Sequence, residues 1–220
     1  MPYRKEPIVT GEIYHVFNRG VERRATFLDE VNYRRFYKTI VYYQNENVPT
    51  RFSFRSRKLI RPKEASGRKM IEVICFCLMP NHFHLLLKQT LDKGIPTYLG
   101  KLTNSYTRYF NTKYKREGHL FQAPYKAVRI ESEEQLLHVS RYIHLNPLVG
   151  GVTPDLRSYK WSSCQEYFGF SLETVCQKHE ILNYFPNPKE KNYEKFVLDQ
   201  TDYARSLEKI KTQLLDETLY

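Results

Sequence analysis

Four short stretches of the chain alternate apolar and polar residues and are rich in β-branched or aromatic side chains, which predicts β-strands. They lie at about residues 12–18, 71–77, 82–88 and 125–130. Apolar residues at helical spacing predict a helix that begins after Asp29, a second at about residues 96–114 and a third at about residues 132–145. The expected order is therefore strand, helix, strand, strand, helix, strand, helix.

This order of elements is typical of one fold class. It predicts an α+β protein with a ferredoxin-like split β-α-β core and an antiparallel sheet, to which a helix is added after the last strand. Ser132 is expected to cap that helix, which is expected to run to about residue 145 and to be stopped by Pro147 together with Gly150 and Gly151. Residues 151–220 are expected to form a C-terminal helical extension that packs on the core formed by residues 1–150.

The positive charge of the chain is concentrated in two segments. The net charge is +11, residues 51–69 contain eight Lys or Arg and one acidic residue, and residues 101–129 contain seven Lys or Arg and one acidic residue. After residue 171 the balance turns acidic. Basic segments interleaved with aromatic residues and His suit a phosphate backbone with exposed bases. A solvated basic face is the alternative that the charge alone leaves open.

Nothing in the sequence is typical of a membrane protein or of a secreted one. No apolar run reaches the roughly 18 residues of a membrane-spanning helix, and the first residues lack the apolar stretch of a signal peptide. The four cysteines show no CxxC spacing, and Cys75 and Cys77 lie in a predicted strand, where they suit a core. We therefore expect a cytoplasmic protein.

The most informative motif is His82-Phe83-His84, at the start of the third predicted strand. The chain is expected to reverse direction just before it, through residues 79–81, as in a β-hairpin. Alternate residues of a strand share a face, so His82 and His84 are expected to project side by side while Phe83 points into the core. Two imidazoles on one strand supply half of a metal site, although two ordinary surface histidines would give the same pattern.

The third predicted helix leads to a second pair of polar residues. Tyr142 and Asn146 are four residues apart and therefore lie on one helical face. The amide oxygen of Asn146 can complete the metal site of His82 and His84, and mixed nitrogen and oxygen ligands with open positions suit Mg²⁺ or Mn²⁺. Such an ion would polarise a phosphodiester that Tyr142 attacks.

Other tyrosines compete for the role of nucleophile, since the chain contains 18. Tyr106 and Tyr109 lie on the second predicted helix among basic residues, although their spacing equally suits packing against a sheet. Tyr125 lies on the fourth predicted strand and is a weaker candidate. A core or hydrogen-bonded tyrosine is likewise the alternative to a catalytic role for Tyr142.

The chain resembles the single-tyrosine HUH transposases, in particular their REP-associated branch. The segments that carry the resemblance follow one another over about two-thirds of the chain: YHVFNRG (14–20), FLDE (27–30), MPNHFHLLLK (79–88), YTRYFNTKYKREGHLFQAPYKA (106–127), SRYIHLNPLVGG (140–151) and WSS (161–163). Two departures are visible. The basic segment before the hairpin is longer than expected for compact members, and residues 148–151 lack the basic residue often found after the proline.

The resemblance implies a catalytic domain over residues 1–150 that nicks and rejoins single-stranded DNA at short hairpins. It implies a divalent metal, Mg²⁺ or Mn²⁺, and a 5′-phosphotyrosine intermediate with a free 3′-OH. His82, His84 and Asn146 match the metal ligands of the family, and Tyr142 matches its nucleophile. We expect DNA contacts from Arg19, Arg55, Arg57, Lys58, Arg108, Lys113, Arg116, His119 and Lys126. The expected partner is hairpin-forming single-stranded DNA, bound at the nucleoid by a monomer or homodimer with no membrane involved.

Two other classes of protein fit parts of the sequence. A non-catalytic regulator that binds DNA or RNA hairpins would keep the fold and the basic segments, and covalent capture of DNA would distinguish a transposase from it. A protein with a structural metal and no role with nucleic acids would keep the histidines. The two basic segments argue against that class, and titration with hairpin DNA would decide.

Overall fold

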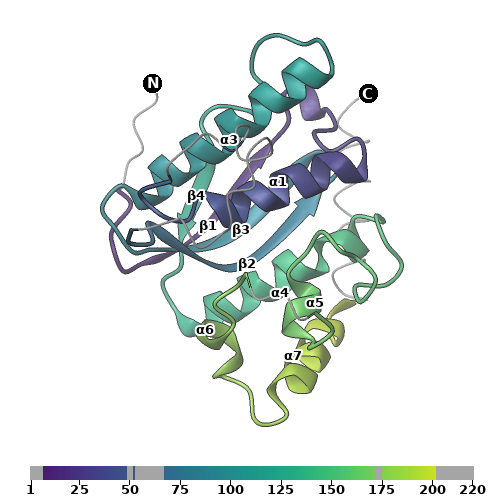
Figure 1. Ribbon diagram of the computed structural model, residues 1–220. Helices are drawn as coiled ribbons and strands as arrows, with labels where there is room; N and C mark the ends of the chain where they lie inside the picture. The colour runs from purple at the N-terminus through teal and green to yellow at the C-terminus, as the bar shows by residue number, and fades with distance from the viewer. Residues whose placement is uncertain (1–6, 49–51, 53–66, 172–174, 202–220) are drawn as a thin grey trace, which may run out of the picture. The chain divides into compact units, whose positions relative to one another are not determined.

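The computed structural model describes residues 7–48, 52, 67–171 and 175–201 (Figure 1). The packing of the backbone divides the chain into two compact units. The first consists of Met1–Ile74 and Pro80–Ile130, and the second consists of Cys75–Met79 and Glu131–Tyr220. Each unit has buried aromatic side chains of its own, such as Phe83 in the first and Tyr193 in the second.

The strands form one four-stranded sheet with the order β2-β3-β1-β4. Its members are β1 (Ile13–Arg19), β2 (Ile71–Met79), β3 (His82–Gln89) and β4 (Lys126–Arg129). A short 3₁₀ turn, η1 (Val21–Arg23), and helix α1 (Glu30–Tyr42) follow β1, while α3 (Gly94–Lys113) follows β3. β1 is antiparallel to both of its neighbours. This order of strands and helices is that of the ferredoxin-like fold, and the predicted α+β class is confirmed.

The two faces of the sheet carry different side chains. Figure 1 shows α1 and α3 on one face. Tyr14 and Val16 of β1 are buried, and Phe83 of β3 packs on that side, with its ring 5.2 Å from the ring of Phe36 on α1. Because strand residues alternate, the opposite face carries His15, Phe17, Arg19, His82 and His84.

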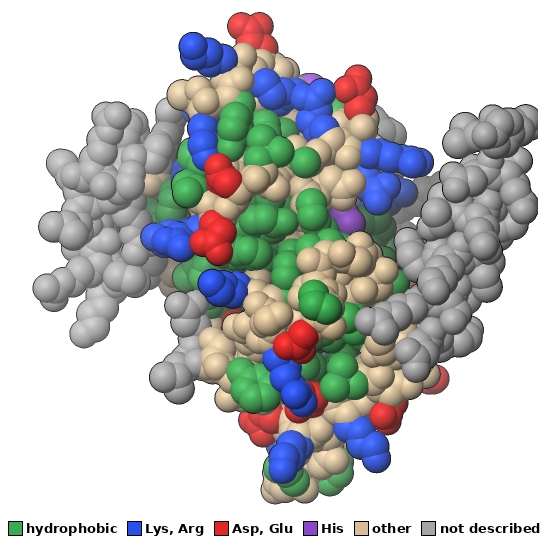
Figure 2. Space-filling view, turned by 90° about the vertical axis from the view of Figure 1, so that its right-hand side faces the viewer, with side chains coloured by type: hydrophobic (Ala, Val, Ile, Leu, Met, Phe, Trp, Pro, Cys, Tyr) green, Lys and Arg blue, Asp and Glu red, His purple; other side chains and the backbone are tan. Residues whose placement is uncertain are grey.

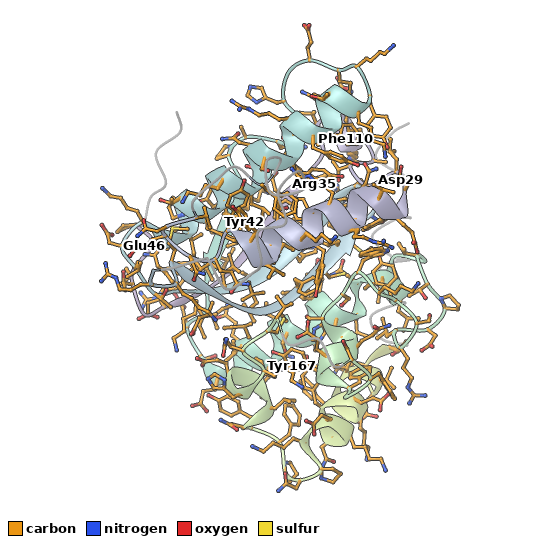
Figure 3. The ribbon with its side chains drawn as sticks, viewed as in Figure 1. Asp29, Arg35, Tyr42, Glu46, Phe110 and Tyr167 are labelled. Atoms are coloured by element: carbon orange, nitrogen blue, oxygen red, sulfur yellow. The ribbon has the colours of Figure 1, made fainter. Side chains whose placement is uncertain are left out.

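Asp29 caps α1, as the sequence predicted, and also ties this helix to the end of α3 (Figure 3). Its Oδ1 accepts a hydrogen bond from the backbone N–H of Asn32 at 2.8 Å, and its Oδ2 accepts one from Nζ of Lys113 at 2.7 Å. The hydrogen bond from Lys113 holds the pKa of Asp29 well below its usual range. The carboxylate therefore links the two helices that cover the sheet.

The second unit contains α4 (Glu133–Val149) and, among its later described residues, three short helices: α5 (Cys164–Tyr167), α6 (His179–Leu182) and α7 (Lys189–Leu198). Ser132 caps α4 as predicted, since its side chain accepts a hydrogen bond from the backbone N–H of Gln135 at 3.1 Å. α4 groups with these later helices, and the expected boundary at residue 150 stays a prediction. Within the described ranges, none of the helices has the length and hydropathy needed to cross a bilayer.

The end of α4 differs from the prediction. The helix was expected to end near residue 145, but it continues to Val149, with Pro147 inside its last turn. Gly150, which was expected to help stop the helix, is its C-cap. A proline lacks an N–H and so removes one hydrogen bond of the helix. The carbonyl of Pro147 is one of the last in the helix and has no partner within it, and it accepts hydrogen bonds from the backbone N–H groups of Val152 and Thr153, at 2.8 and 3.2 Å.

Candidate active site

Strand β3 places His82 and His84 side by side, as their spacing predicts. Their ring centroids lie 5.0 Å apart, and the ring planes are nearly perpendicular, at 86°. Phe83, between them, is fully buried on the other face of the sheet. In the pairing of β1 with β3, His82 lies opposite Arg19 and His84 lies opposite Phe17. The two imidazoles therefore share the face of the sheet that points away from α1 and α3.

The turn before β3 orients the ring of His82. It consists of Pro80 and Asn81, one residue shorter than predicted, because Met79 still belongs to β2. The side-chain Oδ1 of Asn81 lies 2.6 Å from Nδ1 of His82, and its Nδ2 donates to the carbonyl of Arg23 at 3.1 Å. A carbonyl oxygen only accepts, so Nδ1 of His82 donates the hydrogen, and the lone pair of the neutral ring is on Nε2, the atom with which such a tautomer ligates metals.

The ring of His84 meets a histidine that the sequence did not single out. Its Nδ1 lies 3.0 Å from Nε2 of His15 on β1. Burial lowers the pKa of His15 to about 4, and it is also the largest cause that lowers the pKa of His84 well below its usual value. His84 is 5% exposed. Both rings are therefore neutral near pH 7, which is the protonation state that metal binding requires.

Tyr142 and Asn146 lie on α4, in the second unit. The side chain of Tyr142 is 50% exposed, whereas Arg141 and Ile143 beside it are buried. Asn146 donates from Nδ2 to the backbone carbonyl of Tyr142 at 2.9 Å, which leaves its amide oxygen as the atom for a metal. The pair shares one helical face, as its spacing predicts. The histidines belong to the first unit and this pair to the second, so their joint action stays a prediction.

The competing tyrosines are less suited to attack a phosphate. Tyr106 is fully buried, its hydroxyl donates to the carbonyl of Thr26 at 2.6 Å, and burial raises its pKa. The hydroxyl oxygen of Tyr109 is also buried. Tyr125 is half-buried just before β4. Tyr142 is therefore the most exposed of the four tyrosines that the sequence analysis considered.

The residues expected to bind DNA differ in their surroundings. Arg19, Arg108, His119 and Lys126 are exposed, as is Lys113. Two of the residues have partners within the protein, because Lys113 pairs with Asp29 and Arg116 donates to Asn111 at 2.8 Å. Arg55, Arg57 and Lys58 lie outside the described residues. Figure 2 shows Lys and Arg side chains on one face among hydrophobic side chains and several Asp and Glu.

A fourth histidine, His144 on α4, is the centre of a buried network that the sequence did not indicate. Its Nδ1 lies 2.8 Å from the hydroxyl of Tyr193, and its Nε2 lies 2.8 Å from Oγ of Ser163. Its ring also packs against that of Tyr167, at 4.9 Å (Figure 3). Burial lowers the pKa of His144 to about 3. The network anchors the helix that carries Tyr142 to α7 and to the residues before α5.

Replacing His144 with Leu is expected to lower the free energy of unfolding by about 2–4 kcal/mol at neutral pH, because the buried hydroxyls of Tyr193 and Ser163 each lose one of their hydrogen-bond partners. Acid should reduce the difference in the free energy of unfolding between the wild type and His144→Leu. Folded His144 stays neutral down to about pH 3, whereas the unfolded imidazole takes up a proton below its ordinary pKa of 6.5. Below pH 6.5, the neutral imidazole of folded His144 therefore lowers the free energy of unfolding of the wild type by up to about 1.4 kcal/mol per pH unit. The variant has no imidazole at this position, so its stability does not fall for this reason.

Urea unfolding of both proteins, from neutral pH to about pH 5, measures this pH dependence. His179→Ala, which removes an exposed histidine, is the matched control and should follow the wild type. Parallel pH profiles for the wild type and His144→Leu would show that the buried imidazole does not contribute to acid sensitivity.

A family model described as "Transposase IS200 like" matches residues 9–146, more than half of the sequence. The chain therefore belongs to this family of transposases. It is therefore a DNA-processing enzyme, and members of the family generally use a divalent metal. No match was found among curated proteins.

The fold is also similar to that of a solved protein. A REP-associated tyrosine transposase, described as bound to a REP hairpin, has a TM-score of 0.56 and 15% identity over 80% of this chain and 89% of that chain. A candidate transposase from Deinococcus radiodurans R1 has a TM-score of 0.36 and 18% identity over 64% of this chain and 95% of that one. A tRNA(His) guanylyltransferase from Saccharomyces cerevisiae has a TM-score of 0.38 and 14% identity over 87% and 88% of the two chains. Only the first similarity is close enough to support the fold.

The histidine pair suits a divalent ion. His82 and His84 lie on one strand, and the Nδ1 atom of each has a hydrogen-bond partner within the protein, Asn81 for His82 and His15 for His84. Among the residues that the structure describes, no group of three or more His, Cys, Asp or Glu is arranged to hold a metal. The pair therefore needs a ligand of another type, and the amide oxygen of Asn146 is the predicted one.

Proposed function

We propose that the chain nicks and rejoins single-stranded DNA at short, REP-like hairpins. The observation that carries the proposal is the pair of side-by-side imidazoles of His82 and His84 on β3, in a chain of a transposase family. We assign these two histidines, together with Asn146, as the ligands of Mg²⁺ or Mn²⁺. We assign Tyr142 as the nucleophile.

In the proposed reaction, the phenol oxygen of Tyr142 attacks the phosphorus of a phosphodiester and gives up its proton. The bond from phosphorus to the 3′ oxygen of the upstream nucleotide breaks, and that oxygen takes up a proton and leaves as a free 3′-OH. The 5′ end of the downstream DNA stays bound to Tyr142. Attack of a 3′-OH on this phosphotyrosine reverses the steps and rejoins a strand, so the cycle needs no external source of energy.

The side chains have distinct tasks in this reaction. When bound, a divalent ion polarises the scissile phosphodiester. His82 and His84 supply nitrogen ligands whose directions are set by the hydrogen bonds on their Nδ1 atoms. Asn146 supplies an amide oxygen, a ligand type that Mg²⁺ and Mn²⁺ favour. The exposed phenol of Tyr142 is accessible to a DNA strand.

The histidine face of the sheet also carries basic side chains that suit a phosphate backbone. Arg19 lies opposite His82, and Lys126 lies opposite Phe17. The structurally similar REP-associated transposase is described as bound to a REP hairpin. We propose a single-stranded DNA hairpin of the same kind as the partner here, with residues 55–58 as a further source of contacts.

A cleavage assay on single-stranded hairpins tests the proposal. The full chain is incubated with Mg²⁺ or Mn²⁺ and with hairpins from the DNA that flanks its gene, labelled at the 5′ or the 3′ end. The 5′-labelled DNA should yield a shorter fragment with a free 3′-OH. The 3′-labelled DNA should stay attached to the protein after denaturation, because the downstream strand carries the phosphotyrosine bond. EDTA should prevent both products.

A non-catalytic regulator of the same fold would bind the same hairpins but form no adduct. Binding of hairpin DNA with no adduct, in either metal and with every flanking hairpin, would favour that second function and contradict the proposal. The adduct therefore separates the two functions where DNA affinity alone does not.

A further inference from the structure

We propose that His15 is the residue that orients His84 for metal binding. The Nε2 atom of His15 lies 3.0 Å from Nδ1 of His84, across the pairing of β1 with β3. The inference rests on the proposed function, since it assigns a positioning residue to the metal site of His82 and His84. His15 acts in this arrangement as a positioning residue, because its Nε2 is engaged with His84.

Two imidazoles that share one hydrogen bond have two arrangements of the proton. If Nε2 of His15 donates, then Nδ1 of His84 accepts, and the proton of the neutral His84 ring resides on Nε2, which then has no lone pair for a metal. If Nδ1 of His84 donates, then His15 accepts, and the lone pair of His84 is on Nε2. Only the second arrangement is compatible with a metal on His84, so a bound ion requires that Nδ1 of His84 donates and that His15 accepts.

The rings are held in this contact from several sides. The centroids of His15 and His84 lie 5.1 Å apart with the planes at 23°, and Phe17 packs against both, at 5.0 and 5.7 Å. β1 is an inner strand that is paired with β3 on one side and β4 on the other, so the backbone of His15 is fixed by both neighbours. A partner held this rigidly is what maintains the direction of a metal ligand.

The partner of His82 has a different chemistry. Asn81 accepts from Nδ1 of His82 with a carbonyl oxygen, at 2.6 Å, so each histidine of the pair has an acceptor within the protein. Metal-binding histidines usually donate to a carboxylate, a carbonyl or water. His84 instead meets an imidazole, and a neutral acceptor adds little electron density to its ring. The contribution of His15 therefore lies in the tautomer and direction of His84.

Binding of Mn²⁺ to the full chain without DNA tests this role apart from catalysis. His15→Phe keeps an aromatic ring beside Phe17 but removes the acceptor, and it is expected to weaken Mn²⁺ binding about 10- to 100-fold, as measured by electron paramagnetic resonance of the free ion. His15→Gln provides an acceptor oxygen in place of the imidazole nitrogen and should recover most of the affinity. His179→Ala, at an exposed histidine, should bind as the wild type does.

The outcomes separate the inference from the proposed function. Equal Mn²⁺ affinity in His15→Phe and the wild type, together with loss of binding in His84→Ala, would overturn the role of His15 and leave the metal site in place. If His15→Gln binds Mn²⁺ as weakly as His15→Phe does, the positioning role of His15 would also be overturned, because altered packing would then explain the loss of affinity. A wild type that binds Mn²⁺ no better than His84→Ala would overturn the metal site and the inference together.

A second measurement uses only the wild type and does not depend on how the variants fold. Nitrogen-15 NMR of the histidine rings identifies which nitrogen of each ring carries the proton. In the protein saturated with Mg²⁺, His84 should be protonated at Nδ1 and His15 should be unprotonated at Nε2. A proton on Nε2 of His84 under these conditions would overturn the proposal.

Discussion

Replacing Tyr142 with Phe is expected to abolish the covalent DNA adduct and to slow strand cleavage by roughly four orders of magnitude or more, because the attacking hydroxyl is removed. The side chain is half exposed on α4, so the loss of one oxygen leaves the packing of the helix intact. The affinity for hairpin DNA should therefore be unchanged. Denaturing gels with 3′-labelled hairpins measure the adduct, and fluorescence anisotropy measures the affinity.

Two tyrosines of α3 provide matched controls. Tyr106→Phe loses the hydrogen bond from its hydroxyl to the carbonyl of Thr26, which should cost about 1 kcal/mol of stability while the adduct forms as before. Tyr109→Phe should also form the adduct. An adduct that persists in Tyr142→Phe but disappears in one of the α3 variants would transfer the role of nucleophile to α3.

The parts of the fold that depend on neighbouring residues could be predicted from the sequence. The alternation of His82, Phe83 and His84 is a property of any strand, and the structure confirms which side chains share a face. Asp29 and Ser132 cap the helices that follow them, because an N-cap acts on backbone groups only two or three residues away. Together with the order of the strands, these local patterns were sufficient for the ferredoxin-like class.

Element ends that depend on distant groups could not be predicted in the same way. α3 begins at Gly94 rather than near residue 96, and the side chain of Gln89, at the end of β3, accepts a hydrogen bond from the backbone N–H of Ile95 at 3.0 Å. α4 continues past Pro147 to Val149, and backbone N–H groups of Val152 and Thr153, beyond the helix, bond to the carbonyl of that proline. Both contacts join an element to residues outside it, and hydrophobic periodicity carries no signal for them.

In the candidate site, too, the spacing of residues predicts local pairs but not contacts between residues that are distant in the sequence. Spacing brings together His82 with His84 and Tyr142 with Asn146, because each pair follows from the repeat of one strand or one helix. The contact of His84 with His15 joins residues 69 positions apart, so spacing gave no sign of it. The alternation of β1 does place His15 on the same face as Phe17, and this is the signal from which it could have been found.

Replacing His84 with Ala is expected to lower metal-stimulated cleavage about a thousandfold, since loss of a ligand removes several kcal/mol of charge stabilisation at the phosphate. His82→Ala should have a similar effect. Binding of hairpin DNA should be largely retained, because burial keeps His84 neutral and the expected phosphate contacts come from Arg and Lys side chains. Single-turnover cleavage rates over a range of Mn²⁺ concentrations, together with hairpin affinity, measure the two effects separately.

The two histidine variants differ in what else they disturb. His84 is buried, so its removal leaves a cavity beside His15, and unfolding curves must show that the variant is folded under assay conditions. His82 is only partly buried, which makes His82→Ala the cleaner test. Arg19→Ala is the matched control. It should weaken DNA binding and reduce by about 0.7 the slope of the logarithm of the binding constant against the logarithm of the salt concentration, because one phosphate contact is lost. The dependence of cleavage on metal should stay the same. Cleavage at the wild-type rate in both histidine variants would exclude these side chains as ligands. No other pair of histidines in the described part of the chain shares a strand, so no second pair of this kind could take their place.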